Sequence, residues 1–277
     1  AGEGARGATR ETVSKVSRGN FIVDIDLEIV NHTDLMMPYS VRVSILEARG
    51  QYDPYKLPII KLSQEKEISG VIDSKTSIMS EAQVIAANVA QWSDATPVQY
   101  DLVLELLDSD GNTICAKKRR FGFRTTEVIL DKLNINERRV PLTITKYYEF
   151  DPDMGVSVPL ERMRQDIILM KRCGINTIMV QAFPASTKLL NLCDQYGIYV
   201  FALGYANIMY DYVEECTPHP SVVCYGFPPY SLDVNNATKV KNQCELLDNT
   251  RPWYSIEKKL SSFNPFPSEA GVIYGPW

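Results

Sequence analysis

The hydrophobic pattern changes its period near the middle of the 277-residue chain, and this change constrains the fold more than any other feature. In the first half, apolar and polar residues alternate, as in Val23–Ile29 and Val41–Ile45. Such alternation places one face of a strand in a core and the other in water. In the second half, short apolar runs are separated by segments whose apolar residues recur at helical spacing. The chain therefore predicts a β domain followed by an α/β domain.

Several short strands with turn signals between them are expected in the first half. Leu102–Leu106 alternates again, and residues 108–111, Asp-Ser-Asp-Gly, predict a turn into a strand at Thr113–Ala116. This spacing is typical of an antiparallel sandwich of immunoglobulin type.

The second half predicts repeated strand–helix units. Gly174 and Gly197 are placed to end two helices whose apolar faces begin near Leu160 and Leu189. A further helix is expected over Ala237–Leu247. The predicted strands are apolar and short: Thr177–Val180, Ile198–Ala202, Val222–Tyr225 and Trp253–Ile256. Such units form a parallel sheet, and periodicity alone allows either a barrel or a doubly wound sheet.

Composition and charge limit the classes of partner and environment that the chain is expected to have. The net charge of −5 argues against nucleic-acid binding, and the basic run at residues 117–120 is interpreted as a solvated strand end. No apolar run approaches the about 18 residues of a membrane span. Six cysteines in a chain of this length do not predict a disulfide framework, and Cys173 and Cys193 are interpreted as buried thiols. No compartment is indicated.

Segments along the first half resemble those of a known family. Residues 92–102 resemble a strand written "W…P.LY.L", and residues 110–111 with 121–124 resemble a "DG…GFR" ending. Residues 133–136, Leu-Asn-Ile-Asn, resemble an "l.lNG" segment that enters a barrel.

The second half continues the resemblance in the same order. Residues 166–176 match "DI.LMK..G.N", residues 192–200 match "LCDeyGlyV", and residues 219–223 match "HPSv". Together these segments resemble glycoside hydrolase family 2, the β-galactosidase and β-glucuronidase family. The resemblance implies an immunoglobulin-like β-sandwich over residues 1–128 and an incomplete (β/α)8 barrel over residues 129–277, because too few residues follow the fifth strand for three more units.

The resemblance also implies where chemistry belongs. Retaining glycosidases use two carboxyl groups roughly 5–5.5 Å apart. The family's fourth strand ends "WSLGNE", whose Glu is the acid/base, and the matching residues 225–230 end in Pro229 and Tyr230. A phenol with a pKa of about 10 does not replace a carboxylic acid tuned to neutral pH. The acid/base position is therefore predicted to be lost.

Other landmarks of the family survive in part. Glu149 is the remaining match to "NRHE", Gln181 lies in the segment that matches "R.SHYP", and Asn207 lies in the match to "DEANI". With Pro229, these residues are predicted to be the remains of a decayed site.

No segment resembles the family's nucleophile. Glu257 and Glu269 are the candidates by position, and they are interpreted as a solvated helix residue and a loop residue.

A set of aromatic side chains near the predicted strand ends has two interpretations. The rings either form a surface that contacts a sugar, or they fill the mouth of an inactive barrel, and the second interpretation is preferred. The aromatic residues predicted near the strand ends are Tyr147, Tyr148, Phe183, Tyr225, Trp253 and Tyr254.

No cofactor or metal is expected. Cys216, His219 and Cys224 have a spacing that suggests zinc, but a fourth ligand is not evident. The glycosylation triplets at Asn31 and Asn236 do not decide the function.

The main hypothesis is a catalytically inactive family 2-like protein that serves as a scaffold or interaction subunit, with a protein partner covering the open barrel edge. One alternative is a β-galactosidase-like glycosidase completed by another segment or chain. The other is a sugar-binding module without turnover.

Overall fold

The computed structural model describes residues 9–17, 19–48, 65–180, 184–228 and 233–254. Their contacts divide into two compact units. The first comprises the described residues of Ala1–Ala90 with Gln99–Phe123, and the second those of Gln91–Val98 with Arg124–Trp277. The boundary predicted after residue 128 falls inside strand β8 (Thr126–Ile129), which belongs to the second unit.

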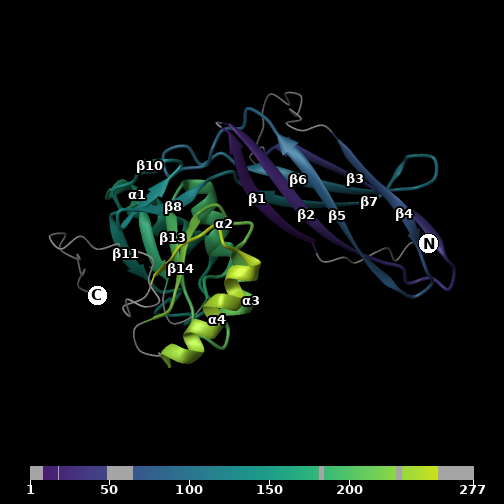
Figure 1. The fold of residues 1–277 in the computed structure, drawn as a ribbon. Coiled ribbons are helices and arrows are strands. Elements are labelled where there is room, and N and C mark those ends of the chain that lie inside the picture. Colours follow the sequence, from purple (N-terminus) through teal and green to yellow (C-terminus); the bar gives the residue numbers. More distant parts are fainter. Residues whose placement is uncertain (1–8, 18, 49–64, 181–183, 229–232, 255–277) are drawn as a thin grey trace. The chain divides into compact units, whose positions relative to one another are not determined.

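The first unit consists of two antiparallel sheets (Figure 1). One has the strand order β1-β2-β5 and the other the order β4-β3-β6-β7. The strands are β1 (Thr9–Ser17), β2 (Asn20–Val30), β3 (Met37–Glu47), β4 (Lys66–Ile72), β5 (Ser77–Ala86), β6 (Tyr100–Leu107) and β7 (Thr113–Phe121). The alternating strands predicted in this half lie within β2, β3, β6 and β7.

The core of the first unit follows from the period of two. Every second residue of β2, from Phe21 to Ile29, is buried. The ring of Phe123 lies 5.1 Å from that of Phe21 and 5.0 Å from those of Tyr100 and Phe121, measured between centroids. Such tilted and edge-on contacts add to the burial of apolar area.

The basic run at residues 117–120 lies within the edge strand β7. Lys118 and Arg120 form ion pairs with Asp101 of the neighbouring strand β6. Charged residues on an edge strand hinder pairing with another chain.

The second unit begins with a small antiparallel sheet of order β10-β9-β8, formed with β9 (Lys132–Ile135) and β10 (Arg138–Arg139). A parallel sheet follows, and its spatial order, β11-β12-β13-β14-β15, is the order along the chain. Its strands are β11 (Ile144–Tyr147), β12 (Thr177–Val180), β13 (Tyr199–Leu203), β14 (Val222–Gly226) and β15 (Trp253–Tyr254).

Strand order decides between the two predicted architectures. A doubly wound sheet reverses its strand order at a switch point, whereas a barrel adds each strand beside the previous one. The parallel sheet shows the second pattern, so it is an incomplete α/β barrel, as predicted.

Helices connect the parallel strands, and local residues set their ends. They are α1 (Leu160–Arg172), α2 (Thr187–Tyr196), α3 (Met209–Cys216) and α4 (Val234–Leu247). Gly174 has a φ of +75° after α1, and the N–H of Ile175 donates to the carbonyl of Met170, which together close the helix. Ser186 and Asp233 accept backbone N–H groups at the starts of α2 and α4.

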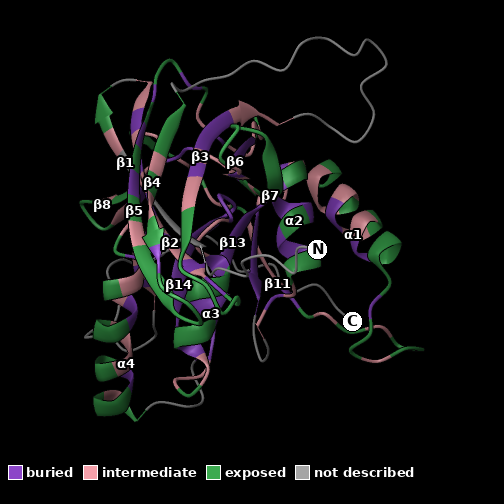
Figure 2. Ribbon diagram, turned by 90° about the vertical axis from the view of Figure 1, so that its right-hand side faces the viewer, coloured by how far each residue is buried: buried purple, intermediate pink, exposed green. Residues whose placement is uncertain are grey.

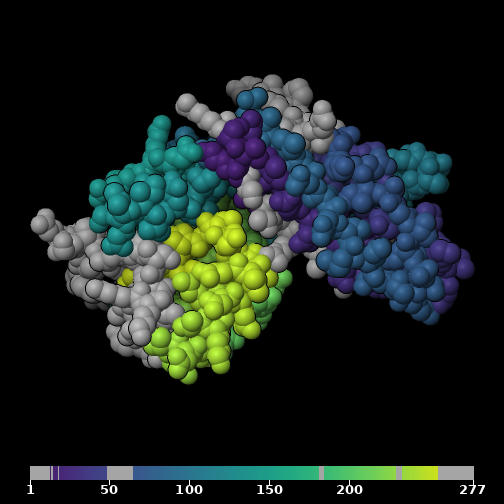
Figure 3. Space-filling view, in the orientation of Figure 1, coloured from purple at the N-terminus to yellow at the C-terminus, as the bar shows by residue number. Residues whose placement is uncertain are grey.

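Both faces of the central strands β12, β13 and β14 are buried, and the visible parts of β13 and β14 are purple in Figure 2. The face toward the helices includes Ile178, Val200 and Val222. Helix α4 lies on the surface of this unit (Figure 3) and buries only Ala237 and Cys244 among its residues.

The interpretation of Cys173 as a buried thiol is wrong, whereas Cys193 is buried as expected. Cys173 is the C-cap of α1, beyond the buried face formed by Met163 and Ile167. In the part of the chain that the structure describes, no helix is long and apolar enough to cross a membrane.

Replacing Phe123 with Ala is expected to destabilise the first unit by about 3–5 kcal/mol, because a fully buried ring with several aromatic neighbours leaves a cavity. Urea unfolding followed by circular dichroism measures the change. Ile114→Ala, at a side chain that is 59% exposed, is the control and should change stability by less than about 0.5 kcal/mol. Equal losses in both variants would contradict this description of the core.

Candidate functional site

The carboxyl ends of barrel strands are where active sites are built. In this structure, Glu149 follows β11 closely, while the described segments after β13 and β14, residues 204–208 and 227–228, contain no Asp or Glu. Asp151, further along the loop after β11, accepts the N–H groups of Asp153 and Met154 in a tight turn. The described strand ends therefore do not bring two carboxyl groups together for catalysis.

Glu149 has a structural partner. Its Oε1 accepts the backbone N–H of Ser186, the N-cap of α2, at 2.6 Å. The Oγ of Ser186 accepts the N–H of Leu189 at 3.2 Å. The two side chains share the N–H groups that a helix start leaves without partners, and a negative charge is favourable there. Glu149 thus caps a helix across the loop from its own strand.

Three of the predicted aromatic residues lie in the core between the sheet and the helices. Tyr147, Tyr225 and Trp253 are 7%, 0% and 1% exposed. The Tyr147 hydroxyl donates to Asp166 Oδ2 at 3.2 Å. Burial is the main cause that raises the pKa of Tyr147, and the negative charge of Asp166 is the second. These side chains are part of the packed core of the second unit.

The apolar cluster at the inner face of the sheet includes Tyr254, which is among the predicted aromatic residues, and three aromatic residues that the prediction did not name. Trp92 contacts Tyr199 edge-on at 5.6 Å between ring centroids, and Phe201 lies 6.5 Å from Tyr254. All four belong to one apolar cluster of the second unit.

Tyr148, at 41% exposure, and Asn207 are the predicted site residues that lie on the surface. The remaining candidates lie outside the described residues, so their roles stay predictions. They are Gln181, Phe183, Pro229, Tyr230, Glu257 and Glu269.

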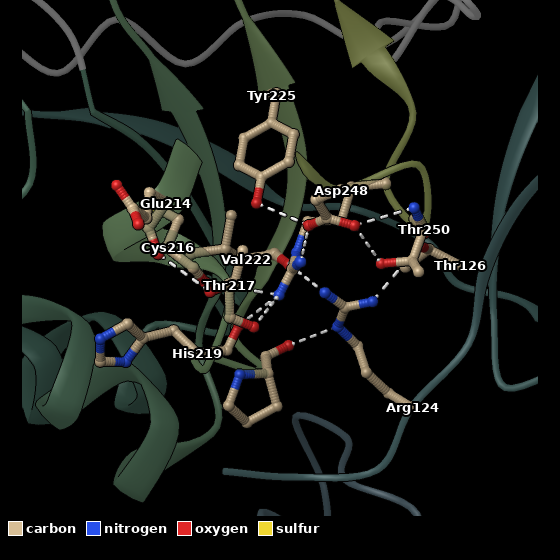
Figure 4. A network of polar contacts seen from close by, with 12 residues as sticks. Arg124, Thr126, Glu214, Cys216, Thr217, His219, Val222, Tyr225, Asp248 and Thr250 are labelled. Carbon is tan, nitrogen blue, oxygen red and sulfur yellow. Dashed lines mark hydrogen bonds and ion pairs between the residues drawn. The ribbon is translucent and has the colours of Figure 1, made fainter. Parts of the chain in front are cut away.

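A buried polar network occupies the opposite, amino ends of β14 and β15 (Figure 4). Arg251 forms an ion pair with Asp248, and its other N–H groups donate to the carbonyls of Thr217, His219 and Val222. Its guanidinium carbon lies 5.5 Å from the centre of the Tyr225 ring, whose hydroxyl donates to Asp248 at 2.8 Å.

A second buried arginine joins this network from the segment that follows β7. Arg124 donates to the carbonyl of Pro220 at 2.7 Å and to that of Val222 at 2.5 Å. Thr126, in β8, donates to the carbonyl of Thr250. The two guanidinium groups therefore fix the turn that leads into β14.

The network shifts the pKa values of its members. Burial alone would raise the pKa of Asp248, but the Arg251 charge and hydrogen bonds from Thr250 and Tyr225 outweigh it and hold the pKa well below its usual range. Burial and the nearby charge of Arg251 lower the pKa of Arg124 to about 9. A barrel's amino-end face serves stability rather than catalysis, so this network is structural.

His219 and Cys224, whose spacing with Cys216 suggests zinc, have hydrogen-bond partners within the protein. His219 Nδ1 lies 2.6 Å from Asp194 Oδ2, and the N–H of Ser221 donates to Asp194 Oδ1 at 3.0 Å. Cys224 Sγ donates to the carbonyl of Tyr225. Among the described residues, no group of three potential metal ligands forms.

Sequence reasoning did not identify Asp194, Asp248 or Arg251. Asp194 and Arg124 lie inside segments that resemble glycoside hydrolase family 2 patterns, so the resemblance was the sequence signal that could have identified them. The spacing of Asp248 and Arg251 in a short loop has no feature that distinguishes it from a solvated ion pair.

The structure combines a β-sandwich with a parallel sheet whose strands follow one another in chain order. This combination defines a multidomain protein with a barrel-type domain. Residues 9–124 match the family model described as glycosyl hydrolases family 2, and residues 126–209 match that of the family 2 TIM barrel domain. The chain belongs to glycoside hydrolase family 2.

Relatives and solved structures agree with this assignment. The chain is 38% identical over 109 residues to a β-galactosidase of Oenococcus oeni, covering 39% of this chain and 11% of the relative. It is 34% identical over 114 residues to a β-galactosidase large subunit of Latilactobacillus sakei, covering 41% of this chain and 18% of the relative.

A crystal structure of a family 2 member from Bacteroides cellulosilyticus matches with a TM-score of 0.77 and 18% identity, covering 90% of this chain and 35% of that one. The likeness to this structure shows a common fold. The matched residues span less than a fifth of the length of the two curated relatives.

Asp248→Asn is expected to cost about 3–5 kcal/mol, because it leaves the buried Arg251 without its counter-charge. The folded-state pKa of Asp248 is lowered, so its contribution is complete above the unfolded value of about 4 and is lost as pH falls toward the folded value.

The variant should therefore lose less stability than the parent protein between about pH 5 and pH 2. Urea unfolding at several pH values measures both effects. Parallel pH profiles for the two proteins would contradict the assignment.

Glu149→Ala is expected to destabilise the second unit by about 1 kcal/mol through loss of the α2 cap. Glu149→Gln keeps an acceptor oxygen and should lose less. Thermal unfolding of both variants tests this, and a larger loss in the Gln variant than in the Ala variant would be inconsistent with capping.

Proposed function

We propose that this chain forms the sandwich and first barrel segment of a β-galactosidase-like glycosidase whose catalytic carboxyl groups come from another segment or another chain. The observation that carries the proposal is the consecutive match of residues 9–124 and 126–209 to the two family 2 models. The curated relatives described above are β-galactosidases by name, which favours β-galactosides as the substrate class.

Completion by another polypeptide has support among these relatives. One of them is named a large subunit, which describes a protein made of more than one chain. In the present chain, β11 and β15 are the outer strands of the described parallel sheet. A closed barrel has no outer strands, so further strands placed beside these two would complete it.

The chemistry sets what the completing part must supply. In a retaining reaction, one carboxyl group protonates the leaving oxygen while the other attacks the anomeric carbon, and water then releases the sugar. The described strand ends offer Glu149, which is held at the start of α2. The role proposed for this chain is therefore to position the barrel and its loops, and the exposed Tyr148 is its candidate for contact with a sugar.

A second candidate is a scaffold or interaction subunit without catalysis. The use of Glu149 as a helix cap favours it, as does the occurrence of Pro229 and Tyr230 where the family pattern has Asn and Glu. The two candidates share the requirement for a partner or further segment, and they differ in whether the completed protein turns over a glycoside.

The test is hydrolysis of 4-nitrophenyl β-D-galactopyranoside by the purified chain alone and by the tagged chain isolated with its native partners. We expect turnover in the native preparation and none above background with the chain alone. A native preparation that is inactive on a panel of aryl β-glycosides would favour the scaffold. Turnover by the chain alone that is lost in Glu149→Gln would contradict both candidates.

A further inference from the structure

A segment between two strands of the sandwich belongs structurally to the barrel unit. Residues Gln91–Val98 are part of the connection from β5 to β6, yet their contacts place them in the second unit. We call residues 91–98 the strap. In sequence, the strap thus lies between two strands of the first unit, whereas its side chains pack in the second unit.

Trp92 is the apolar anchor of the strap. Its side chain is fully buried, and its ring meets that of Tyr199 at an angle of 74°. Its indole N–H donates to the carbonyl of Asp194 at 2.8 Å, which satisfies the polar atom of a buried tryptophan. The amide of Asn136 in turn donates to the carbonyl of Trp92 at 2.9 Å.

Asp94 provides the polar anchor. The Tyr199 hydroxyl donates to Asp94 Oδ1 at 3.0 Å and accepts the backbone N–H of Asp94 at 3.3 Å. The Lys171 ammonium group, from α1, donates to the carbonyls of Asp94 and Gly197 at 2.8 and 3.0 Å. One strap residue therefore joins α1, the end of α2 and the start of β13.

The barrel surface is shaped to receive this segment closely. Gly197 has a φ of +73° at the end of α2, and a Cβ atom there would lie 2.3 Å from the carbonyl oxygen of Asp94. A side chain at this position would both strain the backbone and push the strap away. Gly197 consequently has two functions, which are to end α2 and to admit the strap.

From these contacts we propose that the strap acts as an intramolecular ligand that completes the core of the barrel. The receiving surface recognises a Trp-X-Asp segment through an apolar contact with Tyr199, the Asp194 carbonyl and the Lys171 ammonium group. Without the strap, a cavity replaces the Trp92 ring and the buried end of Tyr199 loses its partner. The barrel therefore reaches its native packing only when residues 91–98 of the sandwich sequence are bound.

This inference does not depend on glycosidase activity. It also explains why a division of the chain at a single boundary near residue 128 would remove part of the barrel core. The occupant to which we commit is the strap of the same chain, because its ends are continuous with Ala90 and Gln99.

Hydrogen–deuterium exchange of the full chain, followed by mass spectrometry, tests the proposal. Trp92→Ala should raise exchange by about a hundredfold in the barrel elements α2 and β13, while β2 and β3 keep their protection. Asp94→Asn, a milder change, should raise exchange in the same elements by a smaller factor. Ala95→Ser, at an exposed strap residue, is the matched control and should change none of them.

Two outcomes would overturn the proposal. The first is increased exchange confined to β5 and β6, the strands on either side of the strap. The second is unchanged exchange in α2 and β13 in both Trp92→Ala and Asp94→Asn. If Trp92→Ala does not fold, Asp94→Asn decides between the outcomes.

Discussion

The buried ion pair of Asp248 and Arg251 is the interaction on which the barrel's sheet most depends. The Asp248 carboxylate offsets the positive charge of the Arg251 guanidinium group, and that group donates hydrogen bonds to several carbonyls at the turn before β14. A buried pair of this kind gives little net stability compared with apolar packing, but losing one partner leaves an uncompensated charge. The pair is therefore best understood as a device that sets the geometry of the turn, and with it the position of β14.

The placement of charge divides the barrel into two ends with different tasks. At the amino ends of the strands, Arg124, Arg251, Asp248 and Asp194 bind one another or the backbone. At the carboxyl ends, the described residues include one nearby carboxylate, Glu149, and it caps a helix. The first arrangement holds the fold together whatever the chemistry. Family membership does not determine the second, because function belongs to sites rather than to folds.

Much of this fold could be predicted from the sequence. The period of two in Val23–Ile29 places one face of a strand in a core, and Gly174 and Gly197 end helices because they adopt a positive φ. These are local properties that neighbouring residues determine. The choice of a barrel over a doubly wound sheet needed the resemblance to a family, since strand order is not a local property.

The candidate site was less predictable for a physical reason. Tyr147, Tyr225 and Trp253 stand near strand ends in the sequence, but the alternation of side chains along each strand turns them toward the helices. The strap illustrates the same limit, because the partners of Trp92 lie about a hundred positions away in the chain. Contacts of this range leave no periodic signal.

Covalent trapping of the nucleophile tests most directly whether the catalytic carboxyl groups lie outside this chain. A 2-deoxy-2-fluoro-β-galactoside with a dinitrophenyl leaving group forms a stable glycosyl-enzyme without help from an acid/base residue. After incubation with the native preparation, peptide mass spectrometry should locate the adduct on a carboxylate outside these 277 residues. An adduct on Glu149, or on any other carboxylate of this chain, would contradict the proposed division of roles.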